Sequence, residues 1–78
     1  MDTKKLFESL SKILESMGMD SMYFQKQGYI FVPVKRNWCR IWFGDKWHVS
    51  VGCEETTFDE FKYAVLYLFA TIQELDMM

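Results

Sequence analysis

The sequence predicts an α+β fold, in which a four-stranded, mostly antiparallel sheet has two helices packed on one face, in the order α-β-β-β-β-α. Two observations support this prediction. Apolar residues recur at helical spacing near both ends of the chain, and the middle holds short segments rich in β-branched and aromatic residues, separated by turn residues. With 78 residues, the chain is expected to form a single domain spanning 1–78. The alternative arrangement places the two helices on opposite sides of the sheet.

Residues 1–17 are predicted to form the first helix, because their apolar side chains fall on one stripe and their charged side chains on the other side. Asp2 or Thr3 can cap the start of this helix, and Gly18 can end it in a left-handed turn. The apolar stripe comprises Leu6, Phe7, Leu10, Ile13, Leu14 and Met17.

Two short strands are predicted next, over residues 21–25 and 29–34, with a turn between them. Pro33 has no N–H to donate, so the second strand needs a sheet edge or a bulge at that point. Alternation along this strand gives two sets of side chains, Ile30, Val32 and Val34 on one face and Tyr29, Phe31 and Pro33 on the other.

Residues 38–51 contain three tryptophans and are predicted to form a hairpin that turns at Gly44. A two-residue turn pairs Trp42 with Trp47, whereas a three-residue turn pairs Phe43 with Trp47. This difference moves the side chains of one strand to the opposite face. Turn chemistry favours the first register, and hydrophobic segregation favours the second, because only the second keeps the arginine of the strand off the buried face. The second register places Cys39, Ile41, Phe43, Trp47, Val49 and Val51 on one face, with Trp38, Arg40, Trp42, His48 and Ser50 opposite.

Residues 52–57 are predicted to be a loop, and residues 58–75 the second helix. Thr57 followed by Glu60 fits the capping-box pattern at a helix start. Asp59 and Glu60 also lie where the helix dipole favours negative charge. The expected core stripe of this helix is Phe58, Phe61, Val65, Leu68, Ile72 and Leu75, and its apolar surface is widened by Tyr63, Leu66, Tyr67 and Phe69.

The composition predicts a folded, cytoplasmic protein that needs no cofactor. Half of the residues are hydrophobic and 18% are aromatic, so a core can form without covalent cross-links. Two cysteines do not make a disulfide framework, and the chain starts with an amphipathic pattern rather than a secretory segment. The longest apolar run is too short to span a bilayer, so no membrane contact is expected.

Charge is unevenly distributed along the chain, although the net charge is only −2. From residue 21 to 52, five basic residues stand against one acidic residue, and from 53 to 78 six acidic residues stand against one basic residue. The protein is therefore expected to have a basic middle and an acidic end.

No catalytic or metal site is predicted, and the chain is expected not to be an enzyme. His48, Cys39 and Cys53 offer three metal ligands at most, without the paired close spacings of structural zinc sites. A Cys–His nucleophilic pair has no sign of an oxyanion hole or substrate cleft beside it. The scattered glycines form no phosphate-binding loop. The preferred interpretation is a solvent-facing histidine and two packed thiols.

Two groups of residues are predicted to bind a partner, because a small monomer rarely exposes many large aromatic side chains without using them. In the competing interpretation, the aromatic residues are core or are covered by another copy of the chain, and the acidic residues cap the helix. The first group is aromatic and basic and the second is acidic: Tyr29, Phe31, Trp38, Arg40, Trp42 and His48, and then Glu54, Glu55 and Asp59.

We therefore expect a small non-enzymatic protein-binding module, an inhibitor or adaptor, that docks by its aromatic sheet face or its acidic helix end. In size, acidity and architecture, the chain resembles the small phage-encoded proteins that block host defence systems, anti-CRISPR proteins among them. No motif carries this resemblance, so it assigns no role to any residue.

Two alternatives stand beside this expectation. One is a homodimeric structural or chaperone-like module, in which the surplus aromatic residues form the two-fold interface. The other is a single-stranded nucleic-acid binder that uses Trp38, Arg40, Trp42 and Lys35. Nucleic acid ranks behind a protein partner, because the chain is acidic, with a pI of about 5.2, and carries no RNA-binding motif.

Overall fold

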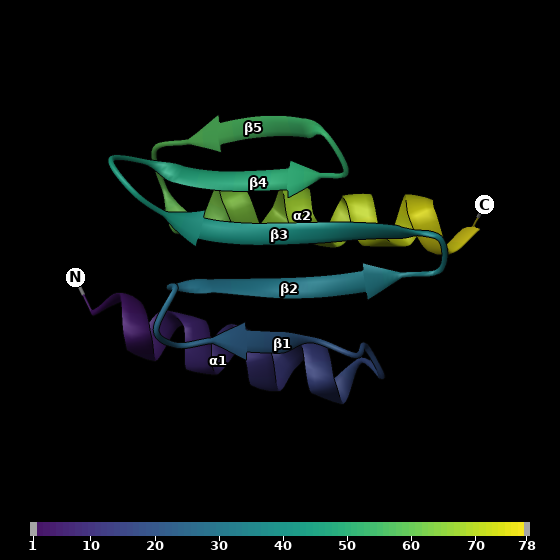
Figure 1. Ribbon diagram of the computed structural model, residues 1–78, viewed down its shortest axis with the longest axis horizontal. Helices are drawn as coiled ribbons and strands as arrows, with labels where there is room; N and C mark the ends of the chain where they lie inside the picture. Colours follow the sequence, from purple (N-terminus) through teal and green to yellow (C-terminus); the bar gives the residue numbers. More distant parts are fainter. Residues whose placement is uncertain (1, 78) are drawn as a thin grey trace.

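Residues 2–77 are described by the computed structural model, and within them lie two helices and five strands (Figure 1). In chain order these are α1 (Thr3–Ser16), β1 (Met22–Phe24), β2 (Tyr29–Val34), β3 (Asn37–Phe43), β4 (Trp47–Val51), β5 (Glu54–Phe58) and α2 (Phe61–Met77).

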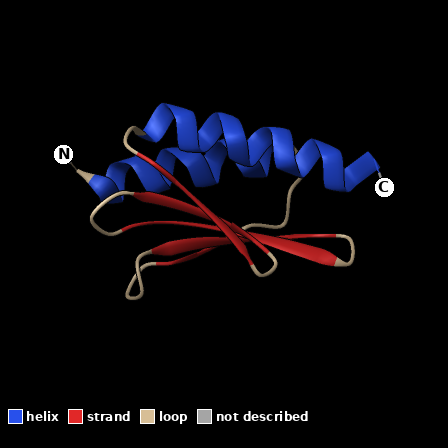
Figure 2. Ribbon diagram, turned by 90° about the horizontal axis from the view of Figure 1, so that it is seen from above, coloured by secondary structure: helices blue, strands red, loops and turns tan. Residues whose placement is uncertain are grey.

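The five strands form one antiparallel sheet in the order β1-β2-β3-β4-β5, so that each strand pairs with its neighbour in sequence. Both helices lie on the same face of this sheet and leave the other face open (Figure 2). α1 packs on β1 and β2, and α2 packs mainly on β3, β4 and β5. The predicted α+β fold with both helices on one face is therefore confirmed, with five strands rather than four. Among residues 2–77, neither helix combines the length and apolarity needed to cross a bilayer.

The ends of α1 are fixed by the residues that the sequence singled out. The Asp2 side chain accepts a hydrogen bond from the backbone N–H of Lys5, at 3.3 Å, and so caps the first turn. At the other end, Gly18 has a φ of +80°, and its N–H donates to the carbonyl of Glu15 while the N–H of Met19 donates to that of Leu14. This pair of bonds is the Schellman arrangement, which needs a residue in the left-handed region.

The β3–β4 hairpin adopts the register that hydrophobic segregation favoured. Phe43 pairs with Trp47, and Ile41 pairs with Val49. The turn between the strands therefore has three residues, and the two-residue alternative is wrong. In this register the arginine of β3 points away from the helices, so no unpaired charge enters the core.

The segment between β4 and α2 differs from the prediction. Residues 52–57 were expected to be a loop, but Glu54–Phe58 forms β5 and pairs with β4 along its whole length. Thr57 consequently lies within a strand and caps no helix, and α2 begins at Phe61. The free edge of β4 offers unpaired backbone groups, and pairing five residues with it satisfies more of them than one additional helical turn would.

Pro33 stands where the sheet has a local edge, as its missing N–H requires. β1 is short and pairs only with Tyr29, Ile30 and Phe31 of β2. Pro33 lies beyond the end of β1 and keeps a partner only in β3.

The core fills the space between the sheet and the two helices. Trp47, the first residue of β4, is the largest fully buried side chain of the core, with ring centroids 5.6 Å from Phe7 of α1, 4.7 Å from Phe61 of α2 and 4.9 Å from Phe43. Its indole is 1% exposed, so it joins both helices to the sheet. The other buried apolar residues are Leu10, Leu14, Ile30, Val32, Val34, Cys39, Ile41, Val49, Ala64, Leu68 and Ile72.

Candidate functional site

The face of the sheet that the helices leave uncovered is rich in aromatic side chains; Figure 1 looks directly onto it, with the helices behind. The strand registers place alternate residues of all five strands on this face. We call it the open face, and it consists of Met22, Phe24, Tyr29, Phe31, Pro33, Trp38, Arg40, Trp42, His48, Ser50, Glu55 and Thr57.

Arg40 lies at the centre of the open face and is surrounded by aromatic rings. The carbon of its guanidinium lies 4.8 Å from the ring centroid of Trp42, 5.3 Å from that of Tyr29 and 5.8 Å from that of Trp38. Each distance is within the range of a cation–π attraction. The guanidinium is therefore held among rings on β2 and β3.

The N–H groups of the Arg40 guanidinium have no acceptor among residues 2–77. Its Nε is buried and makes no hydrogen bond, and no carboxylate lies within ion-pair distance of the side chain. A buried donor without a partner costs about 1–3 kcal/mol. The rings hold this cation without satisfying it, because π faces attract the charge and accept no strong hydrogen bond.

His48 occupies the neighbouring part of the open face, on β4. Its ring stacks on Trp42, with centroids 5.0 Å apart and planes 5° apart. Nδ1 lies 3.0 Å from a carboxylate oxygen of Glu55, and Nε2 lies 3.3 Å from one of Asp45. The hydrogen bond with His48 holds the pKa of Asp45 below its usual range. Both acidic residues near this face are therefore engaged by the histidine.

Beside Arg40, the open face has a hollow of about 360 Å³. The hollow lies over β1, β2 and β3, and it is walled mostly by apolar side chains, which belong to Met22, Phe24, Tyr29, Phe31, Trp38 and Arg40. Phe24 contacts Tyr29 at 4.9 Å between centroids, and Phe31 meets Trp38 edge-on at 5.8 Å. These ring pairs hold the walls in place, so the hollow can receive a side chain without rearranging the sheet.

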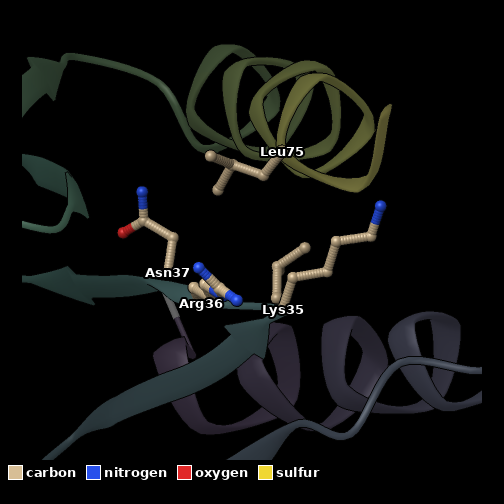
Figure 3. Close-up of a pocket in the computed structure, with 5 residues that line it drawn as sticks. Lys35, Arg36, Asn37 and Leu75 are labelled. Atoms are coloured by element: carbon tan, nitrogen blue, oxygen red, sulfur yellow. The ribbon is translucent and has the colours of Figure 1, made fainter. Parts of the chain in front are cut away.

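A second hollow, of about 550 Å³, lies between the β2–β3 turn and the C-terminal end of α2 (Figure 3). Exposed Lys35, Arg36 and Asn37 line one side of it, and Leu75 lines the other. Lys35 reaches across, and its ammonium donates to the backbone carbonyl of Asp76. This lysine therefore caps α2. We place the candidate site at the smaller hollow, where several aromatic rings and an unsatisfied cation converge.

Most of the residues predicted to bind a partner come together on the open face. These are Tyr29, Phe31, Trp38, Arg40, Trp42, His48 and Glu55. The predicted acidic group is divided instead. Glu54 lies on the helix side of β5, and Asp59 lies at the other end of that strand, 3.6 Å from the ammonium of Lys46. The acidic helix end expected from the sequence is thus not one surface. Lys35, expected among nucleic-acid contacts, points toward α2 rather than onto the open face (Figure 3).

Met22, Phe24 and Asp45 also contribute to this region, and sequence reasoning did not select them. Met22 and Phe24 lie on β1, three residues long, which was too short to give a periodic pattern. Their place follows only from pairing with Phe31 and Tyr29. Asp45 was assigned to the turn alone, and its contact with His48 comes from the three-residue turn.

The residues considered for metal or thiol chemistry do not converge. Cys39 points to the helix side of the sheet, where burial raises the pKa of its thiol to about 11, whereas Cys53 is exposed. His48 points to the opposite face, and its two carboxylate partners approach opposite ring nitrogens, so they share no common point. Within residues 2–77 no group of three such side chains is arranged to hold a metal ion.

No family model, no curated protein and no solved structure matched this chain, so its own residues provide the basis for assigning a function.

Proposed function

We propose that the chain is a small non-enzymatic protein-binding module, an inhibitor or adaptor, that docks on its partner through the open face. The observation that supports this most strongly is the one-sided layering of the fold. Two helices cover one face of the sheet, and the aromatic residues of the other face are half-buried side by side, with no covering element among residues 2–77.

The composition of the open face also supports the proposal. Tyrosine, tryptophan, phenylalanine, methionine and arginine are the residue types enriched in the cores of protein interfaces, and hot spots are enriched in tryptophan, tyrosine and arginine. Seven of the twelve residues of the open face are of these types, namely Met22, Phe24, Tyr29, Phe31, Trp38, Arg40 and Trp42. A contiguous apolar patch of this kind on a small monomer usually marks an interaction site. The resemblance in size, acidity and build to phage-encoded anti-defence proteins is consistent with an inhibitor.

The test compares two matched double variants in capture experiments with tagged chain. Trp38→Ala with Trp42→Ala removes two indoles from the open face, whereas Tyr63→Ala with Leu66→Ala removes two exposed apolar side chains from α2. We expect a partner that binds the wild type and the α2 variant and is lost with the open-face variant. The interaction is then repeated with the purified partner. Equal binding by the two double variants would contradict the proposal.

Sedimentation of the purified chain at micromolar concentration tests self-association separately. A monomer at these concentrations is consistent with an open face that binds a different protein. A dimer that dissociates in the Trp38→Ala, Trp42→Ala variant would instead favour the homodimeric module.

A further inference from the structure

Arg40 is the only lysine or arginine that the strand registers place on the open face. The carbon of its guanidinium lies over the rings of Trp42, Tyr29 and Trp38, and its Nε is buried without a hydrogen-bond partner. The edge of the guanidinium is the part of an arginine that forms paired hydrogen bonds with a planar anion. Arg40 is therefore held in place by rings while its guanidinium still lacks the acceptor that such an anion would supply.

The acidic residues of the same face do not provide this anion. Asp45 and Glu55 each bind His48. Ser50 pairs with Arg40 on one side and with Glu55 on the other, so Glu55 lies two strand spacings, roughly 10 Å, from Arg40. Lys46, the next basic residue along the chain, already has an acidic partner in Asp59. Within the described part of the chain, the positive charge at the centre of the open face is thus left unpaired.

The hollow beside Arg40 adds an apolar requirement. Met22, Phe24 and Phe31 form much of its wall, and its volume of about 360 Å³ is enough for one large side chain. A ligand that fills this hollow and also reaches the Arg40 edge must carry a bulky apolar group next to an anionic one.

We infer that the partner presents an acidic segment in which a carboxylate, from Asp or Glu, lies next to a bulky aliphatic or aromatic side chain. The carboxylate pairs with Arg40, and the apolar side chain enters the hollow. This inference rests on the proposed function and specifies the chemistry of the protein surface that the open face recognises. The surrounding rings exclude water from the ion pair and strengthen it relative to an exposed pair.

Charge on the open face favours a protein segment over a nucleic acid. A single strand brings a phosphate with every nucleotide and is held by several basic residues along its path. Here one arginine stands alone, Lys35 points toward α2, and Glu55 and Asp45 lie across the other end of the face. A single carboxylate of a protein partner can pair with Arg40 without coming close to Glu55 and Asp45.

The experiment selects peptides from a random display library on the immobilised chain and then measures the best peptide in solution. Its affinity is determined by calorimetry, and its location by the indole N–H signals of a ¹⁵N-labelled chain. The same peptide is made with its acidic residue changed to the amide, Asp to Asn or Glu to Gln. Both peptides are tested on the wild type, on Arg40→Met and on Arg40→Lys, with Arg36→Met as the matched control. Arg36 is an exposed arginine of the β2–β3 turn.

We expect the selected peptides to contain Asp or Glu beside an aliphatic or aromatic residue, and to shift the indole signals of Trp38 and Trp42 rather than that of Trp47. Replacing the carboxylate by the amide should weaken binding about tenfold or more, and Arg40→Met should do the same. The two changes together should cost little more than either alone, because each removes the same pair. Arg40→Lys should weaken binding several-fold, because lysine keeps the charge without the planar fork. Arg36→Met should change it less than twofold.

Selected peptides without acidic residues, no selected peptides, or additive effects of the two changes would each overturn the inference. So would salt-dependent binding of a thymidine oligonucleotide at Trp38 and Trp42 in place of peptide binding. If the captured partner depends on the open face but is indifferent to Arg40→Met, the inference fails and the proposed function stands. If capture is indifferent to the open face altogether, both fail.

Discussion

The two faces of the sheet are built from alternate residues of the same strands, and both are largely apolar, yet they differ in kind. On the helix side, the middle of β2, β3 and β4 contributes aliphatic side chains that are fully buried, such as Val32, Ile41 and Val49. The open face has large aromatic rings grouped around Arg40, and most remain half-exposed. Hydrophobicity therefore does not distinguish the core from the candidate binding surface. Aromatic rings with polar edges tolerate partial contact with water, whereas aliphatic side chains stabilise the fold only when they are enclosed.

Two tryptophans on adjacent strands illustrate the difference between the two faces. Trp47 packs against both helices, whereas Trp42 stacks on His48 and contacts Arg40 on the other side of the sheet. Substitutions on the two faces should therefore differ in how much they lower the free energy of unfolding.

The largest effect is expected for Trp47→Ala. This change removes the largest fully buried side chain of the core, which Phe7, Phe43 and Phe61 contact. We expect the free energy of unfolding to fall by about 3–5 kcal/mol, which is most of the stability of a small domain. Urea unfolding followed by far-ultraviolet circular dichroism measures it. A loss below about 1.5 kcal/mol, typical of a surface ring, would show that the core does not depend on Trp47.

Trp42→Ala makes the same change on the opposite face and should cost less. The variant loses the stacking on His48 and one of the three ring contacts with Arg40, which together are worth about 1–2 kcal/mol. Urea unfolding under the same conditions gives the comparison with Trp47→Ala. Equal losses for the two variants would remove the distinction between the faces. Acrylamide should also quench the fluorescence of Trp42 more strongly than that of Trp47, as measured in single-tryptophan variants.

Arg40→Met should leave stability within about 1 kcal/mol of the wild type, because the lost cation–π contacts are offset by removal of a buried donor that has no acceptor. The adjacent residue supplies the control, since Ile41 is fully buried on the helix side and Ile41→Ala should cost about 2–5 kcal/mol. Thermal unfolding of both variants measures the difference. A large loss of stability in Arg40→Met would indicate that the arginine is a structural element of the sheet.

The smallest effect concerns Asp45, whose pKa is lowered by its hydrogen bond with His48. Because the folded-state pKa lies below the unfolded-state value, Asp45 contributes stability above about pH 4 and loses that contribution as the pH falls further. Asp45→Asn should therefore lower stability slightly at neutral pH and flatten the acid limb of the stability profile. Asp20→Asn, which removes an exposed carboxylate from the loop after α1, serves as the matched control. Parallel acid limbs for the wild type and Asp45→Asn would contradict the assignment.

Local sequence signals were sufficient for the ends of α1 and for β2, although Ile13 and Met17 of the predicted helical stripe are exposed rather than packed. The first helix has its cap, its apolar stripe and its terminating glycine within one short stretch, so no distant contact is needed to define it. In β2, the alternation of Ile30, Val32 and Val34 with Tyr29 and Phe31 fixed both faces correctly. Seven of the nine predicted partner-binding residues lie on the open face. Six of these were placed on one face by the alternation along the strands and the three-residue hairpin register, and Glu55 joined them through β5.

Local signals failed at β5, where two interpretations of one segment compete. Thr57 with Glu60 matches a helix-capping pattern, and Glu54–Phe58 also matches an edge strand with Thr56 and Phe58 facing inward. The outcome depends on the unpaired edge of β4, which lies outside the local pattern. The same pairing carries Glu55 to His48 and separates it from Asp59. The acidic group was therefore predicted as a unit only because its members are close in sequence.

The sequence by itself determined which side chains of each strand share a face, because a side-chain period of two is a property of the strand and needs no partner. The tertiary structure decided which face the helices cover and, through the three-residue turn, which set of β3 side chains joins it. That choice follows from packing: the set with Ile41 and Val49 can be covered by the helices and closed off from water, whereas the opposite set would bury Arg40 without an acceptor. Because Arg40 is kept out of the core, it and the aromatic side chains around it lie on the outside of the molecule.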